Sequence, residues 1–273
     1  MGKFDGILLC TDLDGTLFSS DGSLSEENKG AIEYFKSEGG SFTFITGRPP
    51  LTAGRAISLA KPNVPIGCFN GGGIYDHMQG EYVFLYELDE ASRALADAVY
   101  ENIPEVAVHF YTPRQTYFAR VNEASERYSL ITGLDFPRAH YRDIKEPIIK
   151  MVFASLSGEV IEKTKSFLLS HPLSERFDFI RSEFAFFEMI PKGVDKGQLV
   201  DKLAKHLGID TRRTIAAGDY NNDISMVKAA GVGIAVENAV DELKAVADLI
   251  TVSCDRHAIR EIVRMLDEGE LVV

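Results

Sequence analysis

Two aspartates, Asp12 and Asp14, stand one residue apart where a largely apolar run, 4–11, comes to an end. Such a run is typical of a strand that is buried on both faces of a parallel sheet. Residues two apart in an extended chain can point to the same side, and two carboxylates so close raise each other's pKa unless a positive charge lies between them. The pair therefore predicts a site that binds a positively charged group.

Further polar clusters stand at three later points of the chain. They are Thr46-Gly47-Arg48 after a second apolar run, Lys196 at the start of a helical pattern, and Asp219 with Asn222 and Asp223 after a run near residue 215. Ligands of open α/β sheets bind beyond the carboxyl ends of the strands. We therefore expect these clusters to converge with Asp12 and Asp14 at one edge of a sheet.

The residue types in these clusters suit phosphoryl chemistry with Mg²⁺. Carboxylate oxygens such as those of Asp12, Asp14 and Asp219 are hard ligands, and Mg²⁺ typically takes one or two of them and keeps several waters. With the metal screening the charge, one aspartate can attack phosphorus to give an aspartyl-phosphate, and the other can protonate the leaving oxygen. Lys196, the Thr46 hydroxyl and nearby backbone N–H groups would hold the phosphoryl oxygens.

Each cluster alone has an ordinary structural explanation. An isolated Asp-x-Asp is common in loops and surface calcium sites, a lysine at a helix start is usually solvated, and 218–223 could form a turn and an N-cap. Four clusters in this order, all at predicted ends of strands or helices, are much harder to obtain by accident. The combination thus indicates a catalytic site.

The predicted elements place these clusters on a doubly wound α/β sheet. Strands at 4–11, 41–46 and 64–70 alternate with two helices, one that opens at the N-cap Ser25 and one at 50–61, which gives the order β-α-β-α-β. The same rhythm returns after residue 195, where a helix is followed by further strands and helices. This pattern predicts a Rossmann-like core with a parallel sheet.

The middle of the chain follows a different pattern. A hairpin is predicted at 71–87, and helices then mix with strands of alternating type. The stretch 176–190 reads as an antiparallel pair, and its aromatic residues favour sheet packing over a substrate pocket. We therefore predict an inserted α+β domain at 87–189, between the core segments 1–86 and 190–273.

The four motifs resemble those of the haloacid dehalogenase-like (HAD) superfamily of phosphohydrolases, and within it the Cof-type branch. The matching segments are DLDGTL at 12–17, FITGR at 44–48, PKGVDKG at 191–197 and GDYNND at 218–223. The likeness covers roughly 1–85 and 190–273, and the pair DLDGT plus GDxxND is highly specific. An insertion between the second and third motifs implies a type-two cap, which in this family closes over the site, excludes water and supplies substrate-contacting side chains.

The resemblance also implies which residues carry out the reaction. Asp12 would be the nucleophile and Asp14 the acid/base. Mg²⁺ would be bound by Asp12, the carbonyl of Asp14, and Asp219. Asp223 would hold these ligands in position without binding the metal itself.

For the phosphate, the resemblance implies contacts with Thr46, Gly47 and Lys196. Asn222 would lie at the edge between the phosphate and the metal. Two weaker candidates would shape the rim of the site, namely Arg48 and Asn70.

Composition narrows the class of protein. Hydrophobic residues make up 45% and charged residues 26%, and neither a bilayer-spanning stretch nor a leader is recognisable, so we expect a soluble, cytoplasmic protein. The net charge of −12 opposes binding to nucleic acid or anionic membrane, but local cations still allow a small anionic substrate. Cys10, Cys68 and Cys254 form no CxxC pair and are expected to be reduced, the first two in the core, and the histidines show no zinc spacing.

Three functions remain open from the sequence. The first is a Mg²⁺-dependent phosphatase that acts on small phosphorylated metabolites, with sugar phosphates among the candidates. The second is a phosphomutase or phosphotransferase that uses the same aspartate. The third is a non-enzymatic binding domain, against which the intact set of site residues argues. The sequence names neither the substrate nor the oligomeric state.

Overall fold

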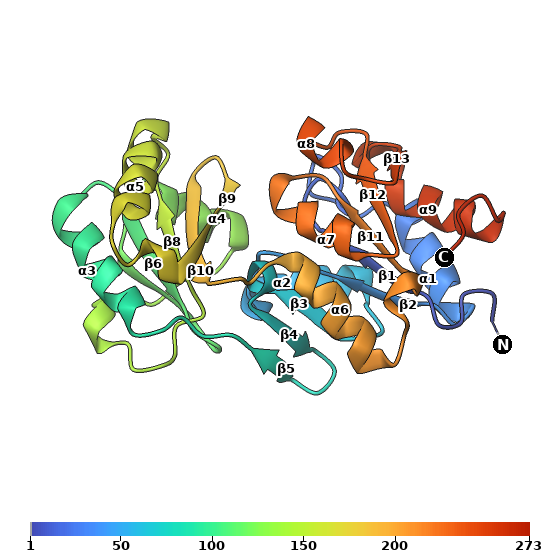
Figure 1. Cartoon of the computed structure of the whole chain (residues 1–273), viewed down its shortest axis with the longest axis horizontal. Coiled ribbons are helices and arrows are strands. Elements are labelled where there is room, and N and C mark those ends of the chain that lie inside the picture. The colour runs from blue at the N-terminus through green and yellow to red at the C-terminus, as the bar shows by residue number, and fades with distance from the viewer. Residues whose placement is uncertain (1) are drawn as a thin grey trace. The chain divides into compact units, whose positions relative to one another are not determined.

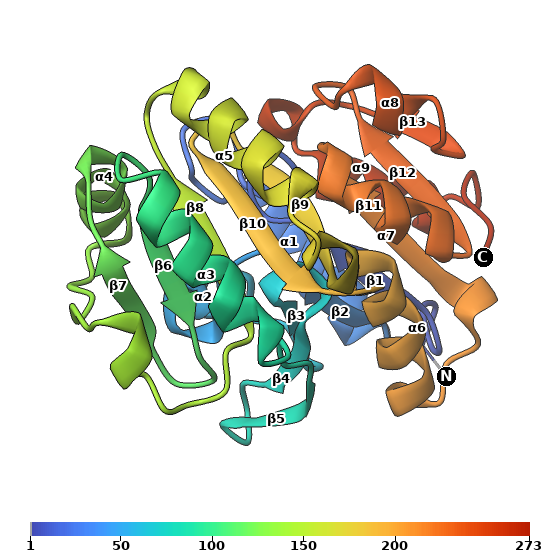
Figure 2. The ribbon, with the colours of Figure 1, turned by 60° about the vertical axis from the view of Figure 1, so that its left-hand side comes forward.

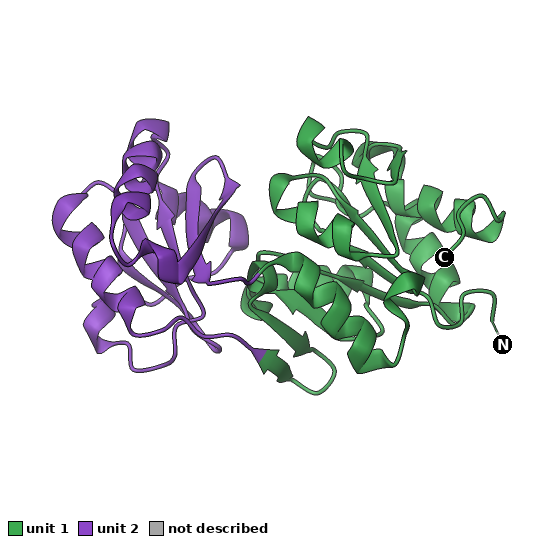
Figure 3. Cartoon of the chain, viewed as in Figure 1, with its two compact units in different colours: residues 1–84, 195–273 green, residues 85–194 purple. Residues whose placement is uncertain are grey.

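The computed structural model describes residues 2–273, which form two compact units. Unit 1 consists of the chain up to Phe84 together with Asp195–Val273, and unit 2 is the segment Leu85–Val194 (Figure 3). The predicted boundaries, 86/87 and 189/190, both differ from these, since unit 1 already ends within the last residues of strand β5 (Glu81–Leu85). The second boundary lies further along because strand β10 (Phe186–Pro191) runs beyond residue 189 and stays paired with its neighbour.

Unit 1 is built on a parallel sheet with the strand order β13-β12-β11-β1-β2 (Figure 1). Its strands are Leu8–Thr11 (β1), Ser41–Phe44 (β2), Thr214–Gly218 (β11), Val232–Val236 (β12) and Leu249–Thr251 (β13). Strand β1 lies between β2 and β11. Because these three strands are parallel neighbours, the segments that follow them start at the same edge of the sheet.

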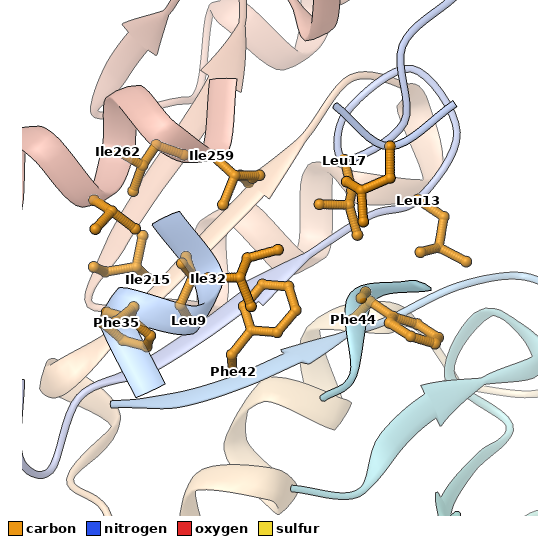
Figure 4. Packing of buried hydrophobic residues seen from close by; sticks show 14 of the residues in the cluster. Leu9, Leu13, Leu17, Ile32, Phe35, Phe42, Phe44, Ile215, Ile259 and Ile262 are labelled. Atoms are coloured by element: carbon orange, nitrogen blue, oxygen red, sulfur yellow. The ribbon is translucent and has the colours of Figure 1, made fainter. Parts of the chain in front are cut away.

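Helices cover both faces of this sheet. They are α1 (Glu26–Ser37), α2 (Pro50–Ala60), α6 (Lys196–Leu207), α7 (Ile224–Ala229), α8 (Asp241–Lys244) and α9 (Ala258–Asp267). Leu9 belongs to a hydrophobic cluster with Ile32 of α1 and Ile259 of α9, shown in Figure 4. Its neighbours Leu8 and Cys10, which point to the opposite face, belong to a cluster with residues of α6 and α7. The predicted doubly wound core is thereby confirmed.

The segment 64–70 departs from the predicted β-α-β-α-β order. Strand β3 (Ile66–Cys68) meets the edge of the main sheet only at the bridge between Ile45 and Gly67, and it then pairs antiparallel with β4 (Gly73–Asp76). The chain reverses after β3 because three successive residues, Phe69, Asn70 and Gly71, have positive φ of 57°, 56° and 111°. Strand β3 therefore starts a small sheet, β3-β4-β5, and is not a full strand of the main sheet. The predicted hairpin is confirmed as β4 and β5 (Glu81–Leu85).

Unit 2 contains an antiparallel sheet with the order β7-β6-β8-β10-β9. Its strands are Ala107–Tyr111 (β6), Thr116–Arg120 (β7), Lys150–Ala154 (β8), Phe177–Glu183 (β9) and β10, and its helices are α3 (Ala91–Asn102), α4 (Glu123–Thr132) and α5 (Gly158–Ser170). Helices α3 and α5 pack against one face of the sheet (Figure 2). Phe177, Phe179 and Phe187 join this packing, which confirms the predicted role of the aromatic stretch.

Two predictions from composition can be compared with the structure. Within residues 2–273, no helix has both the length and the apolar character needed to cross a membrane. Cys10, Cys68 and Cys254 are all buried, and the predicted core location of the first two is thereby confirmed.

Candidate active site

Asp12 occupies the first position beyond β1. Its N–H donates to the carbonyl of Ala217 on β11 at 2.9 Å, so the pairing of the two strands extends to the aspartate. The side chain is 12% exposed, and its Oδ1 accepts a hydrogen bond from Lys196 Nζ at 2.6 Å. The buried lysine therefore fixes one oxygen of Asp12.

Lys196 is positioned by the start of helix α6. Asp195 caps this helix by accepting a hydrogen bond from the N–H of Gln198 at 3.0 Å. The Lys196 ammonium group lies between two carboxylates, since it also donates to Asp223 Oδ1 at 2.5 Å. Burial lowers the pKa of Lys196, but the attraction of Asp12 and Asp223 outweighs burial, so the net pKa is raised and the lysine stays charged.

The loop after β11 is folded around Asp223. Its Oδ2 accepts hydrogen bonds from the backbone N–H groups of Asp219 at 3.0 Å and Tyr220 at 3.1 Å. Gly218 allows the tight approach, because a Cβ at this position would lie 2.5 Å from the Cβ of Asp223. Asp223 therefore ties Lys196 to the loop that carries Asp219.

Asp12, Asp219 and Asp223 form what we call the carboxylate cluster, with one oxygen of each within 4.8 Å of the others. Burial raises the pKa of Asp12 well above its usual range; Lys196 opposes this, and the charges of Asp223 and Asp219 add to it. Burial and the charge of Asp223 raise the pKa of Asp219 to about 6, against the effect of a hydrogen bond from Thr16. Three carboxylates face a single lysine, so the cluster could hold a metal ion that prefers oxygen ligands.

Asp14 does not join the carboxylate cluster, contrary to the expected convergence. Its side chain is 61% exposed, and Nη2 of Arg48 lies 2.7 Å from each of its carboxylate oxygens. Gly15, with φ +77°, ends the extended conformation directly after Asp14. The two neighbouring aspartates therefore have different cations as partners: Lys196 for Asp12 and Arg48 for Asp14.

The segments after β2 and β11 are linked through Asn70. The amide of Asn222 donates to Asn70 Oδ1 at 3.1 Å. Gly47 lets the loop pass closely over Asn70, because a Cβ there would lie 2.8 Å from Asn70 Nδ2. Thr46 is buried, and its Oγ1 accepts a hydrogen bond from the N–H of Arg48 at 3.2 Å. Asn70 itself is fully buried, and it holds the loop after β2 and the loop after β11 together.

Two further polar residues contact the site, although the sequence assigned them no role. Thr16 Oγ1 donates to Asp219 Oδ1 at 3.0 Å, and its place inside DLDGTL was a usable signal. Asn238 follows β12 and donates to the carbonyl of Gly15 at 2.8 Å, while its Oδ1 accepts from the N–H of Cys254 at 2.9 Å. No local pattern marks Asn238, because its role depends on a loop more than 200 residues away in sequence.

Comparisons with known proteins show the family of the chain. A family model described as haloacid dehalogenase-like hydrolase matches residues 9–263. Phosphatase YwpJ of Bacillus subtilis is 26% identical over 299 residues, which cover 95% of this chain and 99% of YwpJ. The 5-amino-6-(5-phospho-D-ribitylamino)uracil phosphatase YwtE of the same species is 28% identical over 288 residues, which cover 96% of this chain and 98% of YwtE.

A solved structure, the HAD subclass IIB sugar phosphatase BT4131, has the same fold. It matches with a TM-score of 0.84 at 23% identity, over 97% of this chain and 100% of BT4131. The family model spans nearly the whole chain, and both YwpJ and YwtE are named as phosphatases. The resemblance found in the motifs is thereby confirmed, and the chain belongs to the haloacid dehalogenase-like hydrolase family as a phosphoester hydrolase of the Cof type.

Proposed function

We propose that this protein is a Mg²⁺-dependent phosphatase that hydrolyses small phosphorylated metabolites through an aspartyl-phosphate on Asp12. The environment of Asp12 is the observation that carries the proposal. The carboxylate is buried at the end of β1, Lys196 fixes one of its oxygens at 2.6 Å, and Asp219 lies close enough to share a cation. A carboxylate held in this way needs little reorganisation before it attacks phosphorus.

The proposed reaction has two displacements. Asp12 attacks phosphorus, the bond to the leaving oxygen breaks, and Asp14 gives a proton to that oxygen. Water then attacks the phosphorus of the aspartyl-phosphate and gives a proton to Asp14, which releases inorganic phosphate and restores the Asp12 carboxylate. Because Arg48 holds both oxygens of Asp14 in this structure, this ion pair must separate before Asp14 can act as an acid.

The metal would be held by the carboxylates of Asp12 and Asp219, together with the main-chain carbonyl of Asp14. When bound, Mg²⁺ supplies positive charge that screens the nucleophile from the phosphate. We assign Asp223 a supporting role because both of its oxygens already accept hydrogen bonds, one from Lys196 and the other from two backbone N–H groups.

The phosphoryl oxygens would be bound by groups from three loops. The proposed donors are the Thr46 hydroxyl, the N–H of Gly47, the Lys196 ammonium and the Asn222 amide. The hydrogen bond from Asn222 to Asn70 supports this assignment, since it orients the amide. Arg48 is proposed to lie at the rim, where its partly exposed cation could attract an anionic substrate once it separates from Asp14.

As the substrate we propose a phosphorylated sugar or polyol. YwtE is named for a substrate with a phosphorylated ribityl chain, and BT4131 is described as a sugar phosphatase. Both descriptions combine a phosphate with a polyhydroxylated carbon chain. We further propose that unit 2 is the specificity domain and that the enzyme acts in the cytoplasm.

A panel of sugar and polyol phosphates, assayed with Mg²⁺ for release of inorganic phosphate, tests the proposal. The wild-type protein should hydrolyse at least one of them, and Asp12→Asn, which keeps the shape of the side chain, should hydrolyse none. Mass spectrometry after a rapid quench should find one phosphoryl group on Asp12. A phosphoryl group on another residue would refute the assignment of the nucleophile, and phosphate transfer to a hydroxyl acceptor instead of water would make the protein a phosphotransferase.

A further inference from the structure

Three loops of unit 1 are joined by the side chain of Asn238. This residue lies in the loop after β12, and its amide is bonded at both ends. Its Nδ2 donates to the carbonyl of Gly15 at 2.8 Å, in the loop after β1. Its Oδ1 accepts from the N–H of Cys254 at 2.9 Å, in the segment after β13. The segment after β13 therefore anchors Asn238, and Asn238 in turn holds the loop after β1.

The loop after β12 also holds the backbone of Asp219. The N–H of Val240 donates to the main-chain carbonyl of Asp219 at 2.9 Å. The loop after β1 contacts the same aspartate, since Thr16 Oγ1 donates to Asp219 Oδ1 at 3.0 Å. The segment 238–240 thus restrains two loops that carry proposed metal ligands, namely the carbonyl of Asp14 and the carboxylate of Asp219.

The turn at Gly15 needs such a restraint. Glycine has the widest range of backbone conformations, so a turn built on it is loose unless neighbouring groups hold it. A residue with a side chain cannot stiffen this turn, because a Cβ on Gly15 would lie 2.6 Å from Asp219 Oδ2. Its φ of +77° disfavours other residues as well. The rigidity must therefore come from hydrogen bonds, and Asn238 supplies the one to the Gly15 carbonyl.

Stability of the fold gives a weaker explanation for these bonds. Asn238 is exposed, so its side chain is not needed to fill the core. A hydrogen bond that competes with water adds little net stability to a protein. The same bond still selects one orientation of the peptide group that it contacts. An amide that bonds to two distant segments is therefore better explained by the geometry that it imposes on the loop after β1.

We propose that Asn238 is a positioning residue of the metal site, which fixes the turn at Gly15 and thereby the main-chain carbonyl of Asp14. The inference rests on the Mg²⁺-dependent function proposed above, in which this carbonyl is a metal ligand. Mg²⁺ demands nearly ideal octahedral geometry, so a ligand that is free to rotate lowers the affinity. A ligand that is already in place costs less conformational entropy on binding. Asn238 acts through Gly15 and needs no contact with the metal or the substrate.

The test measures binding of Mg²⁺ to the substrate-free protein by isothermal titration calorimetry. The variants are Asn238→Ala and Asn238→Leu, and the second keeps the approximate size of the side chain without any hydrogen bond. We expect the Kd for Mg²⁺ to rise about tenfold in both. The Mg²⁺ concentration for half-maximal hydrolysis of p-nitrophenyl phosphate should rise by the same factor. Asn102→Ala is the matched control with an unchanged Kd, because Asn102 is an exposed asparagine of unit 2 that donates to the carbonyl of Ala98 at 2.9 Å.

Urea denaturation without Mg²⁺ separates positioning from a structural role. Both variants should be folded, since Asn238 is exposed. A variant that fails to fold, or one that loses stability but binds Mg²⁺ as tightly as the wild-type protein, would show a structural role and overturn the inference alone. Wild-type affinity in Asn238→Leu would do the same, because leucine cannot hold the Gly15 carbonyl. If the wild-type protein itself bound no Mg²⁺, the proposed metal site would be wrong, and this inference with it.

Discussion

Both units bury a lysine against carboxylates, but their balance of charge differs. In unit 1 the three acids of the carboxylate cluster face Lys196 as their common cation. In unit 2 Lys150 pairs with the single carboxylate of Glu188, with Ser182 donating to its other oxygen at 2.5 Å. The first group carries excess negative charge and the second is neutral. An excess of acids leaves negative charge that a metal ion could balance, whereas the pair in unit 2 is already neutral.

Removal of Mg²⁺, which tests the excess negative charge of unit 1, should have the largest effect on turnover. Without Mg²⁺, repulsion among the carboxylates and between them and the phosphate should abolish turnover. We expect EDTA to stop phosphate release and Mg²⁺ to restore it, while Ca²⁺ fails because it prefers more ligands at longer distances. Full activity of the metal-free protein would contradict the assignment of the carboxylate cluster as a metal site.

Asp14→Asn should show that the exposed aspartate acts separately from the cluster. A general acid contributes on the order of 10²–10⁴-fold, but only where the leaving group needs a proton. A sugar alkoxide needs one, and p-nitrophenolate does not. In single-turnover experiments the variant should therefore slow an alkyl phosphate far more than p-nitrophenyl phosphate, and the aryl substrate should trap phosphate on Asp12. Equal slowing of both substrates would exclude Asp14 as the leaving-group acid.

Lys196→Met and Lys150→Met compare the two buried lysines by stability. Removal of one partner of a buried ion pair costs about 3–5 kcal/mol, so both variants should unfold at lower urea concentration than wild type. Mg²⁺ should recover part of the loss in Lys196→Met, because it can replace the missing cation within the carboxylate cluster. It should recover nothing in Lys150→Met, where one carboxylate offers no metal site. If Mg²⁺ restored the stability of both variants equally, the proposed difference between the two buried lysines would be wrong.

The smallest expected effect concerns His109, which borders the charged pair of unit 2. Burial, together with the charge of Lys150, lowers the pKa of His109 to about 3, and its Nε2 lies 2.7 Å from Ser125 Oγ. The unfolded chain takes up a proton near pH 6.5 and the folded chain does not, so stability falls as the pH drops below about 6.5. Between pH 7 and pH 5 this amounts to about 2 kcal/mol. Urea denaturation of His109→Leu should show a pH dependence smaller by this amount, and an unchanged slope would count against the low pKa.

The sequence predicted the parts of the molecule that depend on local patterns. Four motifs, each a few residues long, mark Asp12, Thr46, Lys196 and Asp219, and apolar runs of the right length mark the strands in front of them. Parallel strands bring such segments to one edge of a sheet, so convergence followed from the element order alone. The insertion at 87–189 was visible as a change of pattern, although the extension of β10 moved its end by a few residues.

Other features depended on contacts between distant segments. Asp14 is exposed and paired with Arg48 because the chain turns at Gly15, and a pattern of two aspartates carries no information about that turn. Asn238 reaches Gly15 from a loop without any motif. Strand β3 left the main sheet because the chain reverses through Phe69, Asn70 and Gly71, which all have positive φ. Asn-Gly is a common turn sequence, but it does not tell which sheet the preceding strand joins.

Local patterns were enough to identify the family, most of the order of the elements and the residue types available for chemistry, since these follow from side-chain identity and from the periods of helix and strand. Which charges are buried together depends on contacts between distant segments, and local patterns do not show it. In sequence, Lys150 and Glu188 are ordinary charged residues 38 positions apart in two alternating strands. The antiparallel register of β8 and β10 made them neighbours on one face of a sheet and removed their water. Desolvation depends on everything that surrounds a side chain, so no local pattern could have predicted it.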